Sequence, residues 1–137
     1  MGAWGAGVFE DDTALDFIEE ALIPHPDPRS VMRQAFEAVL DADYVDYMAG
    51  HAVLVSAAAM RAAQTGQPLE EDEQEEWTEW RKGLADLDFT QLAPLAAKAC
   101  RRVGSERSEL GELWSENDEL FPEWKSGVEA LAATFRG

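Results

Sequence analysis

Cysteine is almost absent from this chain of 137 residues, and its scarcity excludes several classes of protein. Cys100 is the only cysteine, so no intramolecular disulfide can form and the chain is not a disulfide-stapled secreted scaffold. A single thiol also excludes zinc and iron–sulfur sites that need several cysteines. Histidine is nearly as scarce, because His25 and His51 are the only two. We expect no metal site built on these residue types and no cofactor.

Long hydrophobic segments are missing as well. The longest apolar run extends from Ala52 to Met60 and is broken by Ser56, whereas a membrane-spanning helix needs about 20 apolar residues. The N-terminus reads MGAWG and has neither the basic region nor the apolar stretch of a signal peptide. The sequence therefore predicts a cytoplasmic protein that does not insert into membranes.

Basic residues are few compared with acidic ones. Eleven Lys and Arg stand against 28 Asp and Glu, which gives a formal net charge of −17. Such a surface repels phosphate backbones and anionic lipids, so direct binding to nucleic acid or membrane is disfavoured. It attracts cations and basic proteins. A high acidic content also serves solubility alone, and the charge by itself does not separate the two explanations.

Apolar residues are present in ordinary amounts and with helical spacing. They make up 46% of the chain, including five Trp and six Phe, which is enough for a core at this length. They recur every three or four positions, and no stretch alternates with period two for long. The sequence predicts an all-α fold, an irregular bundle of six to seven helices with no significant sheet. We expect a single domain over residues 1–137, with a Gly/Trp arm at residues 1–11 packed on it.

Capping residues, prolines and glycines set the expected helix boundaries. The expected helices begin after Asp11 or Asp12, after Asp27, at Tyr44, with the acidic run 70–76, after Thr90, after Ser105 or Ser108, and near Pro122. The helix from Tyr44 is the longest and is expected to end before Gly66. Gly50 lies inside it, at a cost of about 1 kcal/mol relative to alanine.

One helical face carries the candidate binding residues Tyr44, Tyr47 and His51, with Asp43 and Asp46 on a neighbouring face. Two phenols, an imidazole and nearby carboxylates are the groups of a polar pocket capable of acid–base chemistry. The more ordinary interpretation is a buried histidine that is hydrogen-bonded within a helical core. Both interpretations stay open at this point.

Other patterns favour structural roles over chemistry. The glycines at the start lack the preceding strand of a dinucleotide-binding loop, and Glu10 stands where the last glycine should be. We expect Trp4 and Phe9 to pack in the core instead. The acidic run 70–76 lacks the EF-hand pattern and is typical of a solvated helix start. Cys100 is expected to pack, and we assign no catalytic residue.

Two blocks of the sequence are distinctive, the opening MGAWGAGVFEDDTALDF and GSERSELGELW at 104–114. The first is similar to M-G-x-W-G-x-G-x-F-E-N-D-x-A-x-D-W/F and the second to G-x-x-S-E-L-x-E-L-W, and with these patterns the chain resembles a bacterial family of domains of unknown function, family 4259. The positions that carry the resemblance are Gly2, Trp4, Gly5, Gly7, Phe9, Asp11 (where the family commonly has Asn), Asp12, Asp16, Ser108, Glu109, Leu110 and Trp114. The resemblance implies a compact bacterial domain without an established activity. We also expect the blocks at residues 4–16 and 108–114 to pack together.

Three functional hypotheses follow from the sequence. The favoured one is a non-catalytic protein that binds a basic protein partner through its acidic surface, like immunity or antitoxin proteins in size and charge only. The first alternative is a small-ligand-binding protein or enzyme with a pocket around Tyr44, Tyr47 and His51. The second is a divalent-metal-binding protein that uses the acidic run 70–76. The oligomeric state stays open.

Overall fold

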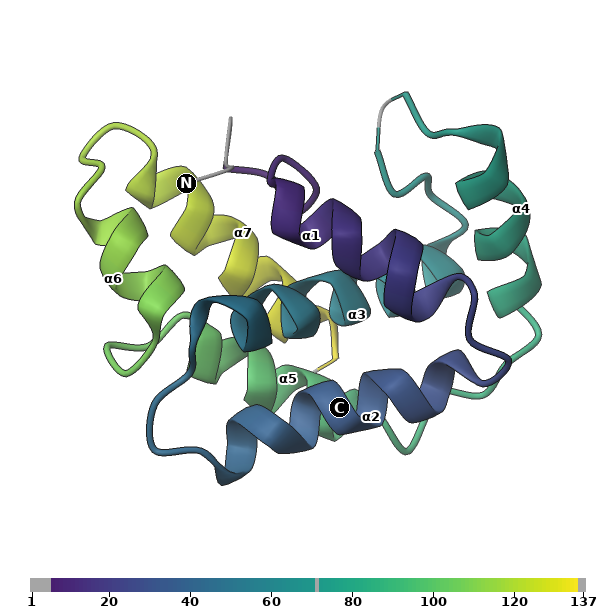
Figure 1. Cartoon of the computed structure of the whole chain (residues 1–137), viewed down its shortest axis with the longest axis horizontal. Coiled ribbons are helices and arrows are strands. Elements are labelled where there is room, and N and C mark those ends of the chain that lie inside the picture. Colours follow the sequence, from purple (N-terminus) through teal and green to yellow (C-terminus); the bar gives the residue numbers. More distant parts are fainter. Residues whose placement is uncertain (1–5, 71, 136–137) are drawn as a thin grey trace.

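The computed structural model describes residues 6–70 and 72–135, and helices account for its regular structure (Figure 1). Within these residues there are seven α-helices, one π-helical segment and no strand. The elements are α1 (Asp12–Phe17), η1 (Ile18–Leu22), α2 (Pro28–Asp41), α3 (Tyr47–Thr65), α4 (Glu75–Leu84), α5 (Ala93–Val103), α6 (Glu109–Ser115) and α7 (Phe121–Thr134). The predicted all-α fold is confirmed. None of the described helices has the length and apolarity that a bilayer crossing requires.

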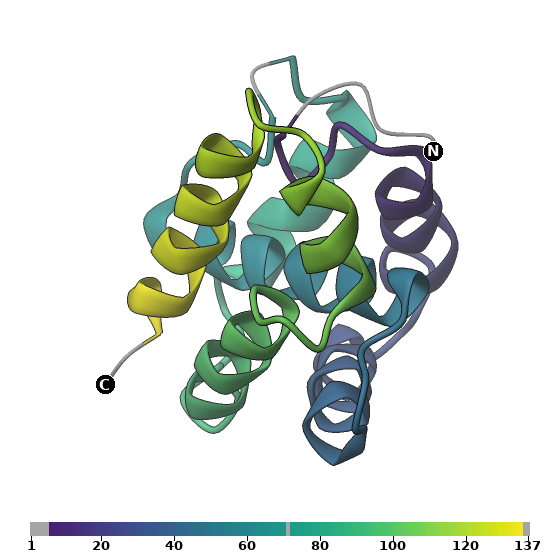
Figure 2. The same ribbon diagram turned by 90° about the vertical axis from the view of Figure 1, so that its left-hand side faces the viewer.

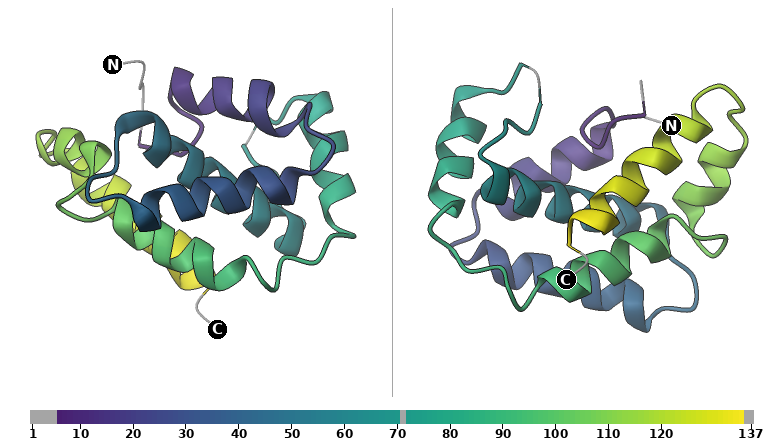
Figure 3. Two further views of the ribbon diagram at one scale, coloured as in Figure 1. Left: turned by 60° about the horizontal axis from the view of Figure 1, so that its bottom comes forward. Right: turned by 180° about the vertical axis from the view of Figure 1, so that it is seen from behind.

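Helix α3 lies at the centre, because its sequence is apolar on every side. Residues 53–60 of this helix are all buried, and a helix that is apolar all round is stable only when other elements surround it. It contacts α1, α2, α4, α5, α6 and α7. In Figure 1, α1 lies on one side of it and α2 on the other, while α6 and α4 lie at opposite ends. Figure 3 (right), seen from behind, shows α7 crossing in front of α3.

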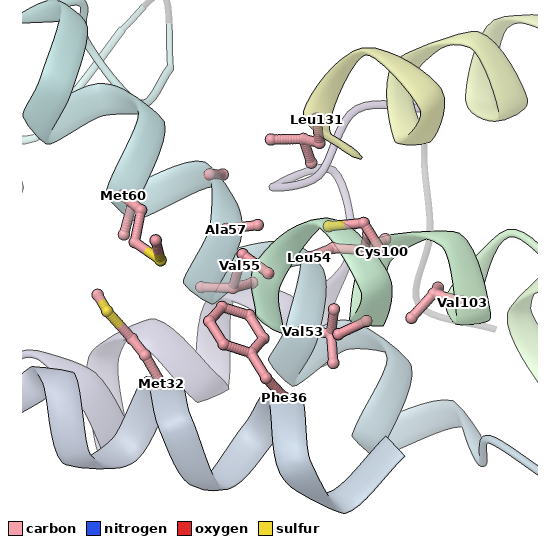
Figure 4. Packing of buried hydrophobic residues seen from close by; sticks show 14 of the residues in the cluster. Met32, Phe36, Val53, Leu54, Val55, Ala57, Met60, Cys100, Val103 and Leu131 are labelled. Atoms are coloured by element: carbon pink, nitrogen blue, oxygen red, sulfur yellow. The ribbon is translucent and has the colours of Figure 1, made fainter. Parts of the chain in front are cut away.

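Apolar side chains from four helices meet at the middle of α3 (Figure 4). Met32 and Phe36 of α2 approach it from one side, and Cys100 of α5 and Leu131 of α7 lie on the other, all of them buried. Burial raises the pKa of the Cys100 thiol to about 12, so the thiol stays protonated and unreactive at neutral pH. Cys100 is a packing residue, as expected.

Several predicted helix ends are confirmed. The Asp11 side chain accepts a hydrogen bond from the Thr13 N–H and caps α1, and Ser108 caps α6 by accepting from the Gly111 N–H. Gly66 ends α3 with a φ of 74°, a left-handed conformation that glycine adopts without strain. Asp27 occupies the N-cap position of α2 without a side-chain capping bond.

Two predicted helix starts are wrong. Helix α3 begins at Tyr47 with Asp46 as its cap, not at Tyr44, because Val45 forms an isolated parallel bridge to Ser108 before the helix starts. Thr90 does not cap α5, which begins at Ala93. Its hydroxyl donates to Asp88 instead. This bond holds residues 88–90 in a turn, so the helix begins further along the chain.

Gly50 lies inside α3 because α6 approaches the helix closely there. A Cβ atom at this position would lie 2.7 Å from Leu110 Cδ1. We expect Gly50→Ala to destabilise the fold by about 1–3 kcal/mol, since the clash outweighs the gain in helix propensity. Gly83 in α4 has no atom within 4 Å of such a Cβ, so Gly83→Ala should stabilise by about 0.5–1 kcal/mol. Urea unfolding of both variants checks this; a stabilised Gly50→Ala would refute the close approach.

The N-terminal arm is described from residue 6 onward. Phe9 is buried and its ring lies 5.4 Å from that of Trp77, centroid to centroid, so its predicted place in the core is confirmed. Gly2, Trp4 and Gly5 lie outside the described residues. The burial of Trp4 stays a prediction.

Candidate functional site

Tyr47, at the first turn of α3, joins two segments that are far apart in the chain. Its hydroxyl donates to Asp11 Oδ2 at 2.5 Å, and its backbone N–H donates to Glu109 Oε1 at 3.0 Å. The Glu109 N–H in turn donates to the Val45 carbonyl, which ties α6 to the residues before α3. Figure 2 shows α6 in front of α3, with α1 beside them. Asp11 of the first sequence block and Glu109 of the second thus both bond to Tyr47, and the direct packing of the two blocks on each other stays a prediction.

Asp11 is a buried carboxylate, with 3% of the residue exposed. Its Oδ1 accepts from the Thr13 N–H at 2.7 Å and lies 3.4 Å from His51 Nε2. Burying a carboxylate is costly unless hydrogen bonds compensate for lost water. The cap bond and the Tyr47 bond supply that compensation, so Asp11 fixes the start of α1 against α3.

His51 is 6% exposed and lies one turn beyond Tyr47 on α3. The Tyr47 ring meets its imidazole edge-on, with centroids 4.6 Å apart. Burial lowers the pKa of His51, and the Asp11 charge opposes this only in part. The imidazole is therefore neutral at pH 7 and forms no ion pair with Asp11. Neither ring nitrogen has a hydrogen-bond partner among the described residues, unlike the hydrogen-bonded core histidine of the ordinary interpretation.

The two tyrosines have different surroundings. Tyr44 is 44% exposed and donates to Glu112 Oε2 at 2.8 Å, a bond that raises its pKa to about 12. Burial and the bond to Asp11 raise the pKa of Tyr47, which therefore remains a donor. Tyr44 thus faces solvent, Tyr47 bridges two segments, and His51 points inward. Tyr44 precedes α3, so the three residues do not share one helical face.

A cavity of about 180 Å³ lies between residues 6–11, α3, α6 and α7. Its lining includes His51, Asp11, Leu54, Arg61, Trp114 and Trp124. The indoles of Trp114 and Trp124 are stacked, with centroids 6.2 Å apart. Arg61 also lines a larger open groove of about 750 Å³ beside residues 67–70. Arg61, ten residues after His51 on α3, and Trp124 of α7 were not predicted as site residues. Each fits an ordinary helical pattern, and only the cavity formed between the helices relates them to His51.

The acidic run 70–76 is not simply a solvated helix start, which corrects the sequence-based expectation. Helix α4 begins only at Glu75, and the Glu73 side chain before it is 5% exposed and paired with Arg81 at 2.9 Å. Burial alone would raise the pKa of Glu73, but bonds from Arg81, the Leu69 N–H and Thr78 outweigh it and lower that pKa. Among the residues that the structure describes, no group of three or more His, Cys, Asp or Glu side chains is placed to hold a metal ion.

Comparison with known protein families gives one match. A family model described as "Domain of unknown function (DUF4259)" matches residues 2–127, nearly the whole chain. The chain belongs to this family. The match spans both segments that meet at Tyr47, the N-terminal one and α6. No curated protein and no solved structure matches the chain.

His51 should make stability depend on pH in a predictable direction. The unfolded chain protonates this residue near its ordinary pKa of 6.5, whereas the folded protein does so only at lower pH. The unfolded state therefore binds the proton first, and stability is lost as pH falls through this range. We expect the unfolding free energy of wild type minus that of His51→Gln to fall between about pH 7.5 and pH 5.5.

Burial and the charges of Glu10 and Asp72 raise the pKa of Glu70. Carboxylates such as this one titrate in both proteins, so their effect is removed when the unfolding free energy of His51→Gln is subtracted from that of wild type. Denaturant unfolding of both proteins across the pH series measures it. A difference that stays constant would mean that folded His51 protonates like a solvent-exposed histidine.

Proposed function

We propose that this protein is a non-catalytic interaction module whose acidic end binds a basic protein partner. The observation that carries the proposal is the location of two exposed apolar side chains. Among the described residues, Met48 at 73% and Tyr44 at 44% are the large hydrophobic residues that are exposed. Both lie around the start of α3, next to carboxylates of three segments. Apolar side chains surrounded by charged ones are typical of a protein-binding surface.

The acidic end consists of Tyr44 and Met48 together with Asp12, Asp43, Asp46, Glu109 and Glu112. Tyr44 and Tyr47 connect these segments through their bonds to Glu112, Glu109 and Asp11. The sequence ranges 1–28, 34–60 and 108–124 contain no Lys or Arg. Arg107, in the loop before α6, is the neighbouring cation. A partner that fits this surface carries Lys or Arg side chains around an apolar contact.

Electrostatics favour such a partner kinetically. A surface of one sign raises the association rate with an oppositely charged protein by roughly 10–1,000-fold at low ionic strength. The same field repels nucleic acid and anionic membranes, in keeping with a cytoplasmic protein-binding role. The phenols of Tyr44 and Tyr47 are held as hydrogen-bond donors to carboxylates, which supports a structural role for them over acid–base catalysis.

Charge reversal tests the proposal. Asp12→Lys/Asp43→Lys changes two exposed residues of the acidic end, and Glu76→Lys/Glu79→Lys makes the same charge change on α4, at the far end of the molecule from α6 (Figure 1). Asp12 and Glu76 both lie in the first turn of a helix, so the cost to helix stability is matched for these two changes.

We expect wild type and the α4 variant to retain the same basic protein in affinity capture from the native host, and the acidic-end variant to lose it. With that partner purified, the association rate should fall steeply between about 0.02 and 0.3 M salt, while dissociation changes much less. Equal retention by both variants, or a rate that does not change with salt, would contradict the proposal.

A further inference from the structure

His51 is covered in part by a short stretch of chain that contains no helix, residues 6–11, here called the covering segment. Residues 6–8 and Asp11 line the cavity beside His51, together with side chains of α3, α6 and α7. Both ring nitrogens of His51 are buried, and neither has a hydrogen-bond partner among the described residues. A buried imidazole in this state gains hydrogen bonds when water reaches it. Displacing the covering segment brings water to His51 without unfolding a helix.

Two side chains anchor the covering segment to the helices. Phe9 is buried, and its ring lies 5.4 Å from that of Trp77, centroid to centroid. Asp11 is buried and accepts a hydrogen bond from the Tyr47 hydroxyl at 2.5 Å. The other residues of the segment are half-buried or exposed. A segment with so few buried contacts opens locally at a lower free energy than the whole protein unfolds.

Three polar groups act on His51, and one of them belongs to the covering segment. Asp11 Oδ1 lies 3.4 Å from His51 Nε2, and its negative charge favours protonation. Tyr47 meets the ring edge-on and stays neutral because its pKa is raised, while the positive charge of Arg61 in the cavity lining disfavours protonation. Among the described residues, the helices other than α3 contribute no titratable side chain to this lining. Burial outweighs Asp11 and lowers the pKa of His51 in the closed form.

We propose that residues 6–11 are a proton-sensitive cover, which leaves α3 when His51 is protonated while the helices stay folded. Once the covering segment has left, water solvates His51 and its pKa returns to the ordinary 6.5. The open form therefore takes up the proton first. The stability of the closed form is complete above this pH and is lost as pH falls through it. Linkage raises the open population by up to about tenfold between pH 7.5 and pH 5.5, and this opening does not depend on the proposed partner.

Cleavage by thermolysin measures the opening. This protease cuts before large apolar residues, and the bond between Val8 and Phe9 becomes accessible only after Phe9 has left Trp77. When cleavage is slow relative to closing, its rate follows the open population. Each rate is divided by that of a peptide of residues 1–17 at the same pH, which corrects for the protease. We expect the corrected rate to rise about five- to tenfold from pH 7.5 to pH 5.5 in wild type, and less than about twofold in His51→Gln.

A second bond shows whether the opening is local. Cleavage before Leu131, which is buried in α7, requires that helix to unfold and should be at least about tenfold slower than cleavage before Phe9 at every pH. This comparison needs wild type alone, and His51→Leu is a second variant without a titratable ring in case His51→Gln does not fold. Equal rates at the two bonds would show that only global unfolding uncovers His51. The same pH dependence in wild type and variant would show that other groups drive the opening, and either result would overturn the proposal.

Discussion

Phe9→Ala should lower the free energy of unfolding by about 3–5 kcal/mol, the cost of removing a large aromatic side chain from a core. Phe9 is 4% exposed and packs against Trp77 of α4, and no hydrogen bond involves its side chain. The loss therefore reports packing alone. Denaturant unfolding at equilibrium measures it.

Two controls make the Phe9 result specific. Phe9→Leu keeps most of the apolar volume and should cost much less. Val8→Ala changes the neighbouring residue, which is only partly buried, and should cost about 1 kcal/mol or less. A loss below about 1 kcal/mol for Phe9→Ala would mean that residues 6–11 do not pack on the helices in solution.

Asp11→Ala should be nearly as destabilising, by about 2–4 kcal/mol. It removes the cap of α1, worth about 0.5–2 kcal/mol, and it leaves the half-buried Tyr47 hydroxyl without its protein acceptor, at about 1–3 kcal/mol. Asp11→Asn keeps a capping oxygen and should cost about 1 kcal/mol. Unfolding of both variants in urea gives the comparison.

A double-mutant cycle with Tyr47→Phe isolates the hydrogen bond itself. If Asp11 and Tyr47 stabilise each other through the 2.5 Å contact, the two substitutions together should cost about 1–3 kcal/mol less than the sum of the single ones. Strictly additive effects would show that the phenol and the carboxylate do not interact in solution.

Helical periodicity predicted most of this fold because the helices around α3 each bury one apolar stripe against α3 or a neighbouring helix. The regularly spaced residues Phe36, Trp77 and Val103 are all buried, and the capping roles of Asp11, Ser108 and Gly66 follow from local backbone chemistry. Sequence patterns within one helix do not predict a helix boundary that is set by a contact with a distant segment. The start of α3 is delayed by the bridge from Val45 to Ser108, which no local pattern indicates.

The candidate site was only partly predictable for the same reason. His51 stood out because histidine is rare in this chain, and the two sequence blocks indicated Asp11 and Glu109. Arg61 gives no signal in the sequence, because it lies ten residues after His51 on α3 and only the cavity between the helices relates the two residues. Glu73 appeared to be one of several solvated acids until the fold paired it with Arg81. Such pairings depend on tertiary distances and not on spacing along one helix.

Site-specific photo-crosslinking tests the central claim, that the acidic end is the surface that binds a partner. A photoreactive amino acid replaces Met48, the most exposed large apolar residue of that surface, and in a separate protein replaces Glu79, which is exposed on α4. Irradiation in the native host should give one discrete crosslinked protein from position 48, basic in composition, and none from position 79. The yield should fall when Asp12 and Asp43 are changed to Lys in the same chain. Equal crosslinking at both positions, or a product at position 48 that the charge reversal leaves unchanged, would contradict the account.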